Sequence, residues 1–519
     1  MNQQFSGAAA IRAAMMIMGS TYITYALGLL TSILVARSLG PEGFGRYTYV
    51  VWIVGVLIAV GNNGLTTSAI RFVSESLGQG SLDSARSVHG WLQRRQFACL
   101  AIVAVAFIVM MPFFIPAGWE GHLGGFMAIA VGASLAKATF LFDVSVAKGY
   151  GKFGVEAKST IGMSIINIVA VLVLVFFDAP LMGYLVLFGA ISTGYAISST
   201  VMLRRAGVRA SREPLDAGIK PRLHKHLLWT VILTLSHALA DRSVETYLLN
   251  ALIGSAAVGF FAIAASLTKG GMDLLASGLS TVLMPMMAHA FGVGGQARVN
   301  VIMASAIRYF MFIGLLMAGV GTLVAAPAVA LMYGASYAEV VTPLRVMILV
   351  GGLTMTTAAF NSLLSTTDNQ HLRVVFAVLS IGVTFAFAIF LIPRYGLLGA
   401  VASHAASTTL IFVLMAMGIT RVMRLRLPWR ELLLQIGCAL AAALVALVPV
   451  LLVPGNVSMV AGAVIFALVF VLSTALSKAW RASDIGHIVA FLERYPRVHE
   501  RLGGPLTRWA LRLPVDTTP

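Results

Sequence analysis

Four ionisable residues lie close together in an apolar stretch near the middle of the chain. His237, Asp241 and Glu245 follow one another at intervals of four, so a helix places them on one face, and Arg242 stands three residues before Glu245. A guanidinium binds a diphosphate through paired hydrogen bonds, which makes Arg242 a candidate anion ligand. The two carboxylates and the imidazole are candidates for handling a coupling proton or Na⁺. The alternative is a self-neutralising network, Arg242–Glu245 and His237–Asp241, that fixes helix packing.

Other charged residues lie in or beside apolar stretches, where an ionisable side chain costs roughly 3 kcal/mol and needs a cavity or a partner. Lys137 has no carboxylate within pairing distance along its own helix, which makes it a candidate anion ligand. Lys269 and Asp273 either pair with each other and fix helix packing, or Lys269 contacts the substrate and Asp273 the coupling ion. The two glycines between them loosen the helix. Arg308 lies near the edge of an apolar stretch. It is either a substrate contact or a side chain that extends to the membrane interface. Arg71 is equally a receiver of an anionic substrate or an anchor at the membrane interface.

A polar break interrupts the second apolar stretch at Gly61-Asn62-Asn63-Gly64. A break of this kind can expose backbone groups to a cavity, and Asn62 and Asn63 are candidates for hydrogen bonds to sugar hydroxyls. The alternative is hydrogen bonding between helices that pack through small residues.

The sequence carries no signature of an enzyme or a metal site. Cys99 and Cys438 both lie in apolar runs, and they give neither a disulfide framework nor metal-ligand spacing. The Walker A pattern for binding ATP phosphates is missing. We therefore expect no catalytic residue, no metal, no cofactor and no enzymatic activity.

The elements that must position these residues are membrane-spanning helices. Of the 519 residues, 59% are hydrophobic and 11% are charged, and the mean hydropathy is +0.91. Such a chain cannot cover a large soluble domain with polar groups. Runs of about 20 apolar residues predict an all-α polytopic membrane protein with about 14 transmembrane helices. The expected spans are 14–36, 47–70, 97–115, 124–147, 159–177, 182–203, 227–250, 257–288, 302–332, 340–366, 372–392, 396–420, 432–453 and 457–477.

The formal net charge of +17 has a topological explanation. If the N-terminus is cytoplasmic, 28 of the 36 Lys and Arg residues fall in inner segments, as the positive-inside rule requires. We expect a multi-pass protein of the cell inner membrane with both termini in the cytoplasm. Its basic surface would meet anionic membrane lipids, so no nucleic-acid partner is needed.

A short motif occurs twice and indicates an internal duplication. Gly40 and Gly45 lie in a G-x-x-x-x-G-x-aromatic pattern between two expected spans, and Gly254 and Gly259 repeat it. Glycine tolerates the positive φ of a tight turn. The motif predicts two six-helix lobes related by a repeat, followed by two extra helices. The expected domains are an N-lobe at 1–203, a basic cytoplasmic linker at 204–226, a C-lobe at 227–420, helices 13–14 at 421–477 and a basic amphipathic cytoplasmic tail at 478–519.

Several stretches together resemble polysaccharide-transport flippases of the O-antigen type, within the superfamily of multidrug, oligosaccharidyl-lipid and polysaccharide exporters. They are Ala36–Tyr47 (ARSLGPEGFGRY), Val258–Ala264 (VGFFAIA), Pro285, Leu331–Tyr337 (LMYGASY) and Ile392–Ala400 (IPRYGLLGA).

This resemblance implies a function and its partners. Such proteins move an oligosaccharide linked to polyprenyl diphosphate from the inner to the outer leaflet by alternating access, and their transport is coupled to an ion gradient. The implied role is surface polysaccharide biosynthesis, such as O-antigen or exopolysaccharide, alongside a polysaccharide polymerase and glycosyltransferases. The alternatives are a multidrug or cation antiporter of the same superfamily and, less favoured, a membrane polymerase or ligase.

Overall fold

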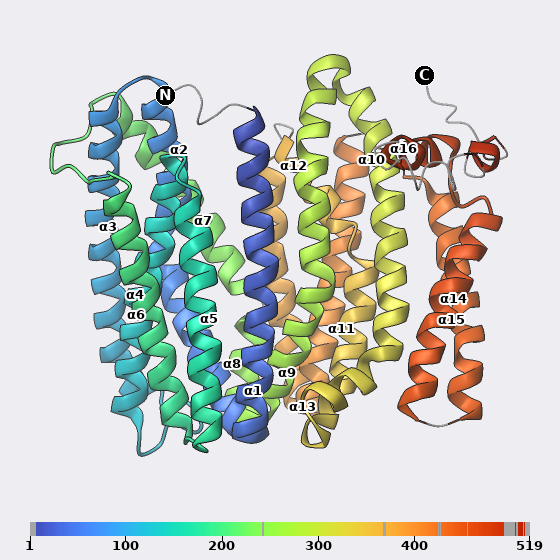
Figure 1. Ribbon diagram of the computed structural model, residues 1–519, viewed down its shortest axis with the longest axis horizontal. Helices are drawn as coiled ribbons and strands as arrows, with labels where there is room; N and C mark the ends of the chain where they lie inside the picture. Colours follow the sequence, from blue (N-terminus) through green and yellow to red (C-terminus); the bar gives the residue numbers. More distant parts are fainter. Residues whose placement is uncertain are drawn as a thin grey trace. The chain divides into compact units, whose positions relative to one another are not determined.

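The computed structural model describes residues 7–240, 243–366, 370–423, 425, 427–453, 455–492, 504, 507–511 and 513, and the regular elements within them are all helices. The α-helices of Figure 1 are α1 (Gly7–Asn62), α2 (Leu65–Gly78), α3 (Leu82–Met110), α4 (Leu123–Gly149), α5 (Gly154–Phe176), α6 (Leu181–Arg205), α7 (Ile219–Ala240), α8 (Ser243–Leu252), α9 (Ser255–Thr268), α10 (Leu274–Met332), α11 (Val341–Leu353), α12 (Thr357–Thr366), α13 (Gln370–Val422), α14 (Trp429–Leu452), α15 (Asn456–Leu476) and α16 (Ala482–Leu492). A π-helical segment (Lys269–Asp273) joins α9 to α10, and short 3₁₀ turns occur at Met111–Phe113 and Ala335–Val340.

The helix lengths account for the expected membrane spans. Eleven stretches of the described residues are long and apolar enough to cross a bilayer. Two of them, at 19–62 and 372–422, have 44 and 51 residues, and each contains a glycine with non-helical backbone angles that divides it. The remaining expected span, 227–250, lies on α7 and α8. The prediction of an all-helical polytopic membrane fold is therefore confirmed.

The repeated glycine motif forms turns at both of its copies, as predicted. Gly40 has a φ of 66° and Gly254 has a φ of 120°, a region that residues with a Cβ rarely adopt. The second glycine of each copy has a different role, because it brings two backbones together. A Cβ on Gly45 would lie 1.8 Å from the carbonyl oxygen of Ser255, and a Cβ on Gly259 would lie 3.1 Å from the amide nitrogen of Gly45. The two copies of the motif therefore pack on each other.

The described chain forms two compact units. Unit 1 comprises residues 1–262 together with 377–403, and unit 2 comprises 263–376 together with 404–519. These boundaries differ from the lobes expected from the repeat, since 227–262 and 377–403 lie in unit 1. The repeat-based domains remain a prediction.

Unit 1 is a bundle in which α4 packs on α1, α2 and α6, and α5 packs on α1 and α6 (Figure 1). One of its apolar clusters joins α2, α3 and α4 to the linker and to α7 through buried side chains such as Phe72, Leu92, Phe142 and Leu223. The last residues of the expected linker are therefore helical and packed rather than loose.

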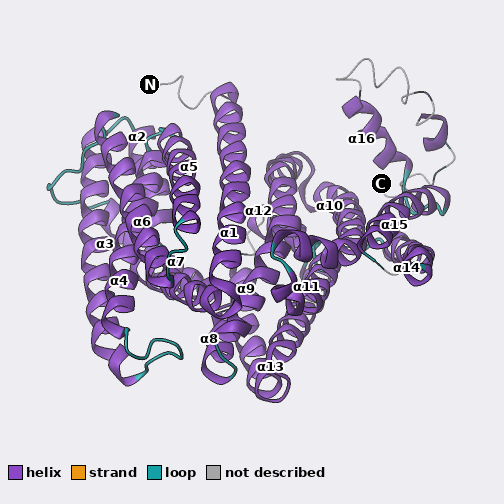
Figure 2. Cartoon of the chain, turned by 60° about the horizontal axis from the view of Figure 1, so that its bottom comes forward, coloured by secondary structure: helices purple, strands orange, loops and turns teal. Residues whose placement is uncertain are grey.

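Unit 2 is built around α10, which packs on α11, α12, α14 and α15. Figure 2 shows α14 and α15 side by side, and they are one of the most extensively paired sets of helices in the chain. Phe466 and Phe470 of α15 stack with ring centroids 5.7 Å apart and enter the same core as Phe310 and Met311 of α10. The two extra helices are thus part of the core of unit 2.

Candidate substrate-binding site

A buried polar junction lies where α1 ends, as the sequence break predicted. The helix stops at Asn62, and the next two residues have positive φ, 45° at Asn63 and 74° at Gly64. The amide of Gln96 on α3 donates to the Asn62 side-chain oxygen at 2.8 Å and to the Ala138 carbonyl on α4 at 2.9 Å. Asn62 donates to the same carbonyl at 3.3 Å. Asn62 is 5% exposed, so these contacts favour the alternative of interhelical hydrogen bonding for this residue.

Lys137 neighbours this junction on α4 and lies near the middle of that helix. Its ammonium nitrogen lies 3.4 Å from the ring centroid of Tyr195 on α6 and 4.9 Å from that of Phe140. The Tyr195 hydroxyl is 3.0 Å from the hydroxyl of Ser164 on α5, which fixes the ring. Among the described side chains, no carboxylate forms an ion pair with Lys137.

The two ring contacts stabilise the ammonium of Lys137 within its span. A cation–π contact contributes about 0.5–2 kcal/mol, depending on how far the pair is desolvated, and a lysine at the centre of a span costs roughly 3 kcal/mol. The rings therefore offset much of this cost, but they leave the positive charge without an anionic partner among the described side chains. Lys137 is half-buried rather than sealed, so an anion can complete its environment.

The α7 helix meets the same junction through one of its polar residues. A Cβ on Gly64 would lie 2.7 Å from the Thr230 side chain, so the break in α1–α2 fits closely against α7. One turn earlier on α7, His226 accepts a hydrogen bond from Arg71 at 3.1 Å through its Nδ1 atom. Burial, and then the Arg71 charge, lower the pKa of His226 below 6.5. Arg71 is exposed and also lies over the Phe72 ring, so its guanidinium stays accessible.

The central acidic and basic group of the sequence is described only in part. Asp241 and Arg242 lie outside the described residues, as do the side chains of His237 and Asp273. Glu245 is 1% exposed and lies in the first turn of α8. The Trp52 indole on α1 donates to the Ser243 hydroxyl at 3.3 Å, which ties the start of α8 to α1. The proposed roles of these residues remain predictions.

The glycine pair after Lys269 loosens its helix, as expected. Lys269–Asp273 is π-helical, with one extra residue in the turn, and Lys269 is exposed. Such π turns occur often at functional sites.

Arg308 and Asp143, two charged residues of the apolar helices, are both buried. Arg308 is 1% exposed and donates to both carboxylate oxygens of Asp484, at 2.8 and 2.7 Å. Asp143 is 2% exposed and accepts hydrogen bonds from Ser199 and Thr200. Arg308 therefore does not extend to the membrane interface. Its charge is already matched by the carboxylate of Asp484, so it is not part of the candidate site.

Sequence reasoning missed the residues that hold the site together. Gln96 was placed just outside an expected span, although its amide reaches two other helices. Tyr195 resembled an ordinary apolar residue of its span. For Asp484, the available sequence signal was an acidic residue within a basic tail. Among the described residues, no group of three metal-ligating side chains is present.

Comparison with known protein families assigns the chain to one of them. A family model described as polysaccharide biosynthesis protein matches residues 10–291, more than half of the chain. The protein is thus a polytopic membrane protein of the class that serves polysaccharide biosynthesis. The chain belongs to the polysaccharide biosynthesis protein family, as the sequence resemblance indicated. No curated protein sequence matches it significantly.

Solved structures share the fold at low sequence identity. The lipid II flippase MurJ in an inward closed conformation is similar with a TM-score of 0.66 and 13% identity, over 88% of this chain and 97% of that one. An inward-facing multidrug resistance MATE family transporter of the MOP superfamily gives a TM-score of 0.60 and 16% identity, over 78% and 96%. A point mutant of the Vibrio cholerae MATE transporter VcmN gives 0.55 and 16%, over 79% and 97%. This chain therefore shares its fold with these three structures.

Proposed function

We propose that this protein moves an oligosaccharide linked to polyprenyl diphosphate from the cytoplasmic to the outer leaflet by alternating access, coupled to an ion gradient. The family membership and the fold support a transporter for polysaccharide biosynthesis. The observation that carries the choice of substrate is Lys137, a mid-span cation without a carboxylate partner among the described side chains.

The positive charge of Lys137 favours the flippase over the antiporter alternative. A site for cationic drugs requires acidic or aromatic groups free of a competing cation. Here an ammonium already occupies the face of Tyr195, at 3.4 Å from the ring centroid. This arrangement suits a diphosphate, which would draw the ammonium from the ring, and it opposes a cationic substrate.

The proposal also gives roles to the other predicted residues. We propose that Arg242 contacts the diphosphate, that Arg71 receives it at the mouth of the site, and that Asn63 reaches the sugar. Lys269 is a further candidate anion contact. Asp241, Glu245, His237 and Asp273 are proposed to handle a proton or Na⁺. On this proposal the protein is a component of the inner membrane, with both termini in the cytoplasm, that works beside glycosyltransferases and a polymerase.

Reconstituted vesicles test the proposal directly. The probe is a fluorescent oligosaccharide on polyprenyl diphosphate, and a membrane-impermeant reductant bleaches the molecules in the outer leaflet. We expect the wild-type protein to make the inner pool accessible. The Lys137→Gln variant should lose at least 90% of this rate, Lys137→Arg should retain part of it, and the exposed Lys158→Gln should match the wild type.

A deletion strain distinguishes the remaining alternative. Loss of a flippase leaves lipid-linked repeat units on the cytoplasmic leaflet, whereas loss of a polymerase leaves them unpolymerised outside. Full activity of Lys137→Gln in vesicles would remove Lys137 from the mechanism. Accumulation outside in the deletion strain would overturn the flippase assignment itself.

A further inference from the structure

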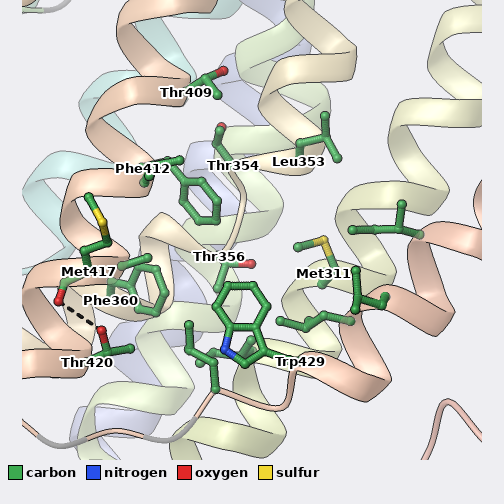
Figure 3. A pocket seen from close by; sticks show the side chains of 17 residues that line it. Met311, Leu353, Thr354, Thr356, Phe360, Thr409, Phe412, Met417, Thr420 and Trp429 are labelled. Carbon is green, nitrogen blue, oxygen red and sulfur yellow. Dashed lines mark hydrogen bonds between the residues drawn. The ribbon is translucent and has the colours of Figure 1, made fainter.

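Unit 2 contains an apolar cavity that the proposed transport site does not use. Its volume is about 380 Å³, and its walls come from α10, the α11–α12 junction, α13 and the start of α14 (Figure 3). The rings of Phe360 and Phe412 stack on one side with centroids 6.1 Å apart. Ligand sites in proteins measure roughly 300–1,000 Å³, so this cavity can hold part of a small ligand or a single hydrocarbon chain.

The length of the cavity corresponds to one leaflet of a bilayer. One face of α13 lines it from Thr409 to Thr420. These positions are eleven residues apart, which is about 16 Å at a rise of 1.5 Å per residue. Half of a hydrocarbon core of roughly 30 Å is nearly the same distance. A lipid chain that entered at one end would therefore reach the middle of the membrane.

One end of the cavity carries the features of a membrane interface. Trp429 lines it and is 62% exposed, as expected for an aromatic residue at headgroup level. Arg421 and Arg430, both exposed, directly follow the lining residues Thr420 and Trp429. The adjacent Glu431 does not neutralise them, because it binds Arg481 at 2.8 Å. This end is therefore basic and suits a phosphate.

A hydroxyl without a partner points to a ligand with an acceptor oxygen. Thr356 lies in the break between α11 and α12, lines the cavity and is 1% exposed, and its hydroxyl makes no hydrogen bond within the described structure. The hydroxyls of two other lining residues, Thr354 and Thr420, donate to carbonyls of their own helices. A buried hydroxyl left unpaired is costly, so an acceptor oxygen supplied by a ligand would stabilise Thr356.

We propose that this cavity is a binding site for one anionic phospholipid of the cytoplasmic leaflet. One acyl chain fills the apolar cavity, an ester carbonyl accepts the Thr356 hydrogen bond, and the phosphate lies between Arg421 and Arg430. The site is separate from the anion site at Lys137 in its residues and in its ligand. It holds whether or not the protein transports a lipid-linked oligosaccharide.

Native mass spectrometry of the delipidated full-length protein tests the site. The probes are phosphatidylglycerol, phosphatidylcholine and a polyprenyl monophosphate, each titrated alone and in competition. We expect one tightly bound phosphatidylglycerol. Ala416→Phe, which fills the cavity, should weaken it about tenfold, whereas Ala406→Phe on the same helix outside the lining should not.

Two further variants keep the test independent of folding. Thr356→Val preserves the shape of the side chain and removes the donor, so affinity should fall several-fold. Replacing both Arg421 and Arg430 with Gln should cost about fivefold for each arginine with phosphatidylglycerol and leave phosphatidylcholine unchanged. Arg298→Gln, at another exposed arginine, is the charge-matched control.

Three results would overturn the proposal. Wild-type binding by both Ala416→Phe and Thr356→Val would show that the cavity does not hold the chain. Equal affinity for the two phospholipids in wild type and in the double arginine variant would exclude headgroup recognition. Displacement of phosphatidylglycerol by polyprenyl monophosphate at lower concentration would assign the cavity to the prenyl chain instead.

Discussion

The buried ion pair between Arg308 and Asp484 gives a prediction with a large expected effect. The two side chains are 1% and 0% exposed, and two hydrogen bonds of 2.8 and 2.7 Å join them. Removing Asp484 leaves a guanidinium buried among apolar neighbours with only the Ser305 hydroxyl, at 3.0 Å. Breaking a buried pair in this way costs about 3–5 kcal/mol. Asp484→Ala should therefore lower the free energy of unfolding by that amount, and Asp484→Asn, which keeps an acceptor, by about 1.5–3 kcal/mol.

A double-mutant cycle measures the interaction itself. The double variant Arg308→Met with Asp484→Leu removes both charges and should be close to wild type, since well-packed apolar residues often replace a buried pair without loss. Unfolding by SDS in mixed micelles gives the free energies. The Arg222–Glu75 pair, with side chains 53% and 28% exposed, is the matched control and should show less than about 1 kcal/mol of coupling. A coupling energy for the buried pair as small as that of the control would refute the reasoning.

Three other predictions concern unit 1. Gly45→Ala places a methyl group 1.8 Å from the Ser255 carbonyl and should lower the free energy of unfolding by about 1–3 kcal/mol. The control Gly28→Ala, with nothing within 4 Å of its Cβ, should change this free energy by less than about 0.5 kcal/mol. Equal losses in the two variants would contradict the packing argument. Gln96→Leu should cost about 1–3 kcal/mol by leaving buried partners unpaired, measured by the same unfolding, and an unchanged value would show that the polar junction is not stabilising. Since the folded pKa of His226 is lowered below 6.5, the unfolded chain takes up its proton first, and stability falls as the pH drops from about 7 through 6.5 toward the folded value. His226→Asn should reduce the loss of melting temperature between pH 7.5 and 5.5; an identical loss in both proteins would exclude this group.

Local composition was sufficient to predict the features that depend on neighbouring residues. Apolar runs located the spans, the Asn62–Asn63 dipeptide located the break, and the glycines after Lys269 located the π-helical segment. These features follow from backbone entropy and hydropathy within a few residues, so they need no knowledge of the remaining chain.

The parts that the sequence left open depend on distant contacts. Arg308 and Asp484 are 176 residues apart, and neither position alone shows that it will be buried. Gln96 and Tyr195 are uncharged, so hydropathy does not single them out, yet they hold two elements of the polar site. The return of 377–403 to unit 1 likewise depends on packing between helices far apart in sequence.

The contact between the two copies of the glycine motif limits which residues either copy can carry. Gly45 from the first copy lies against the backbone of Ser255 in the second, and Gly259 of the second lies against Gly45 in turn. A side chain gained in either copy meets main chain of the other, which cannot be replaced by a smaller residue. A substitution at Gly45 or Gly259 therefore requires the main chain of the other copy to move. The requirement for glycine at these two positions is structural and is independent of the transported molecule.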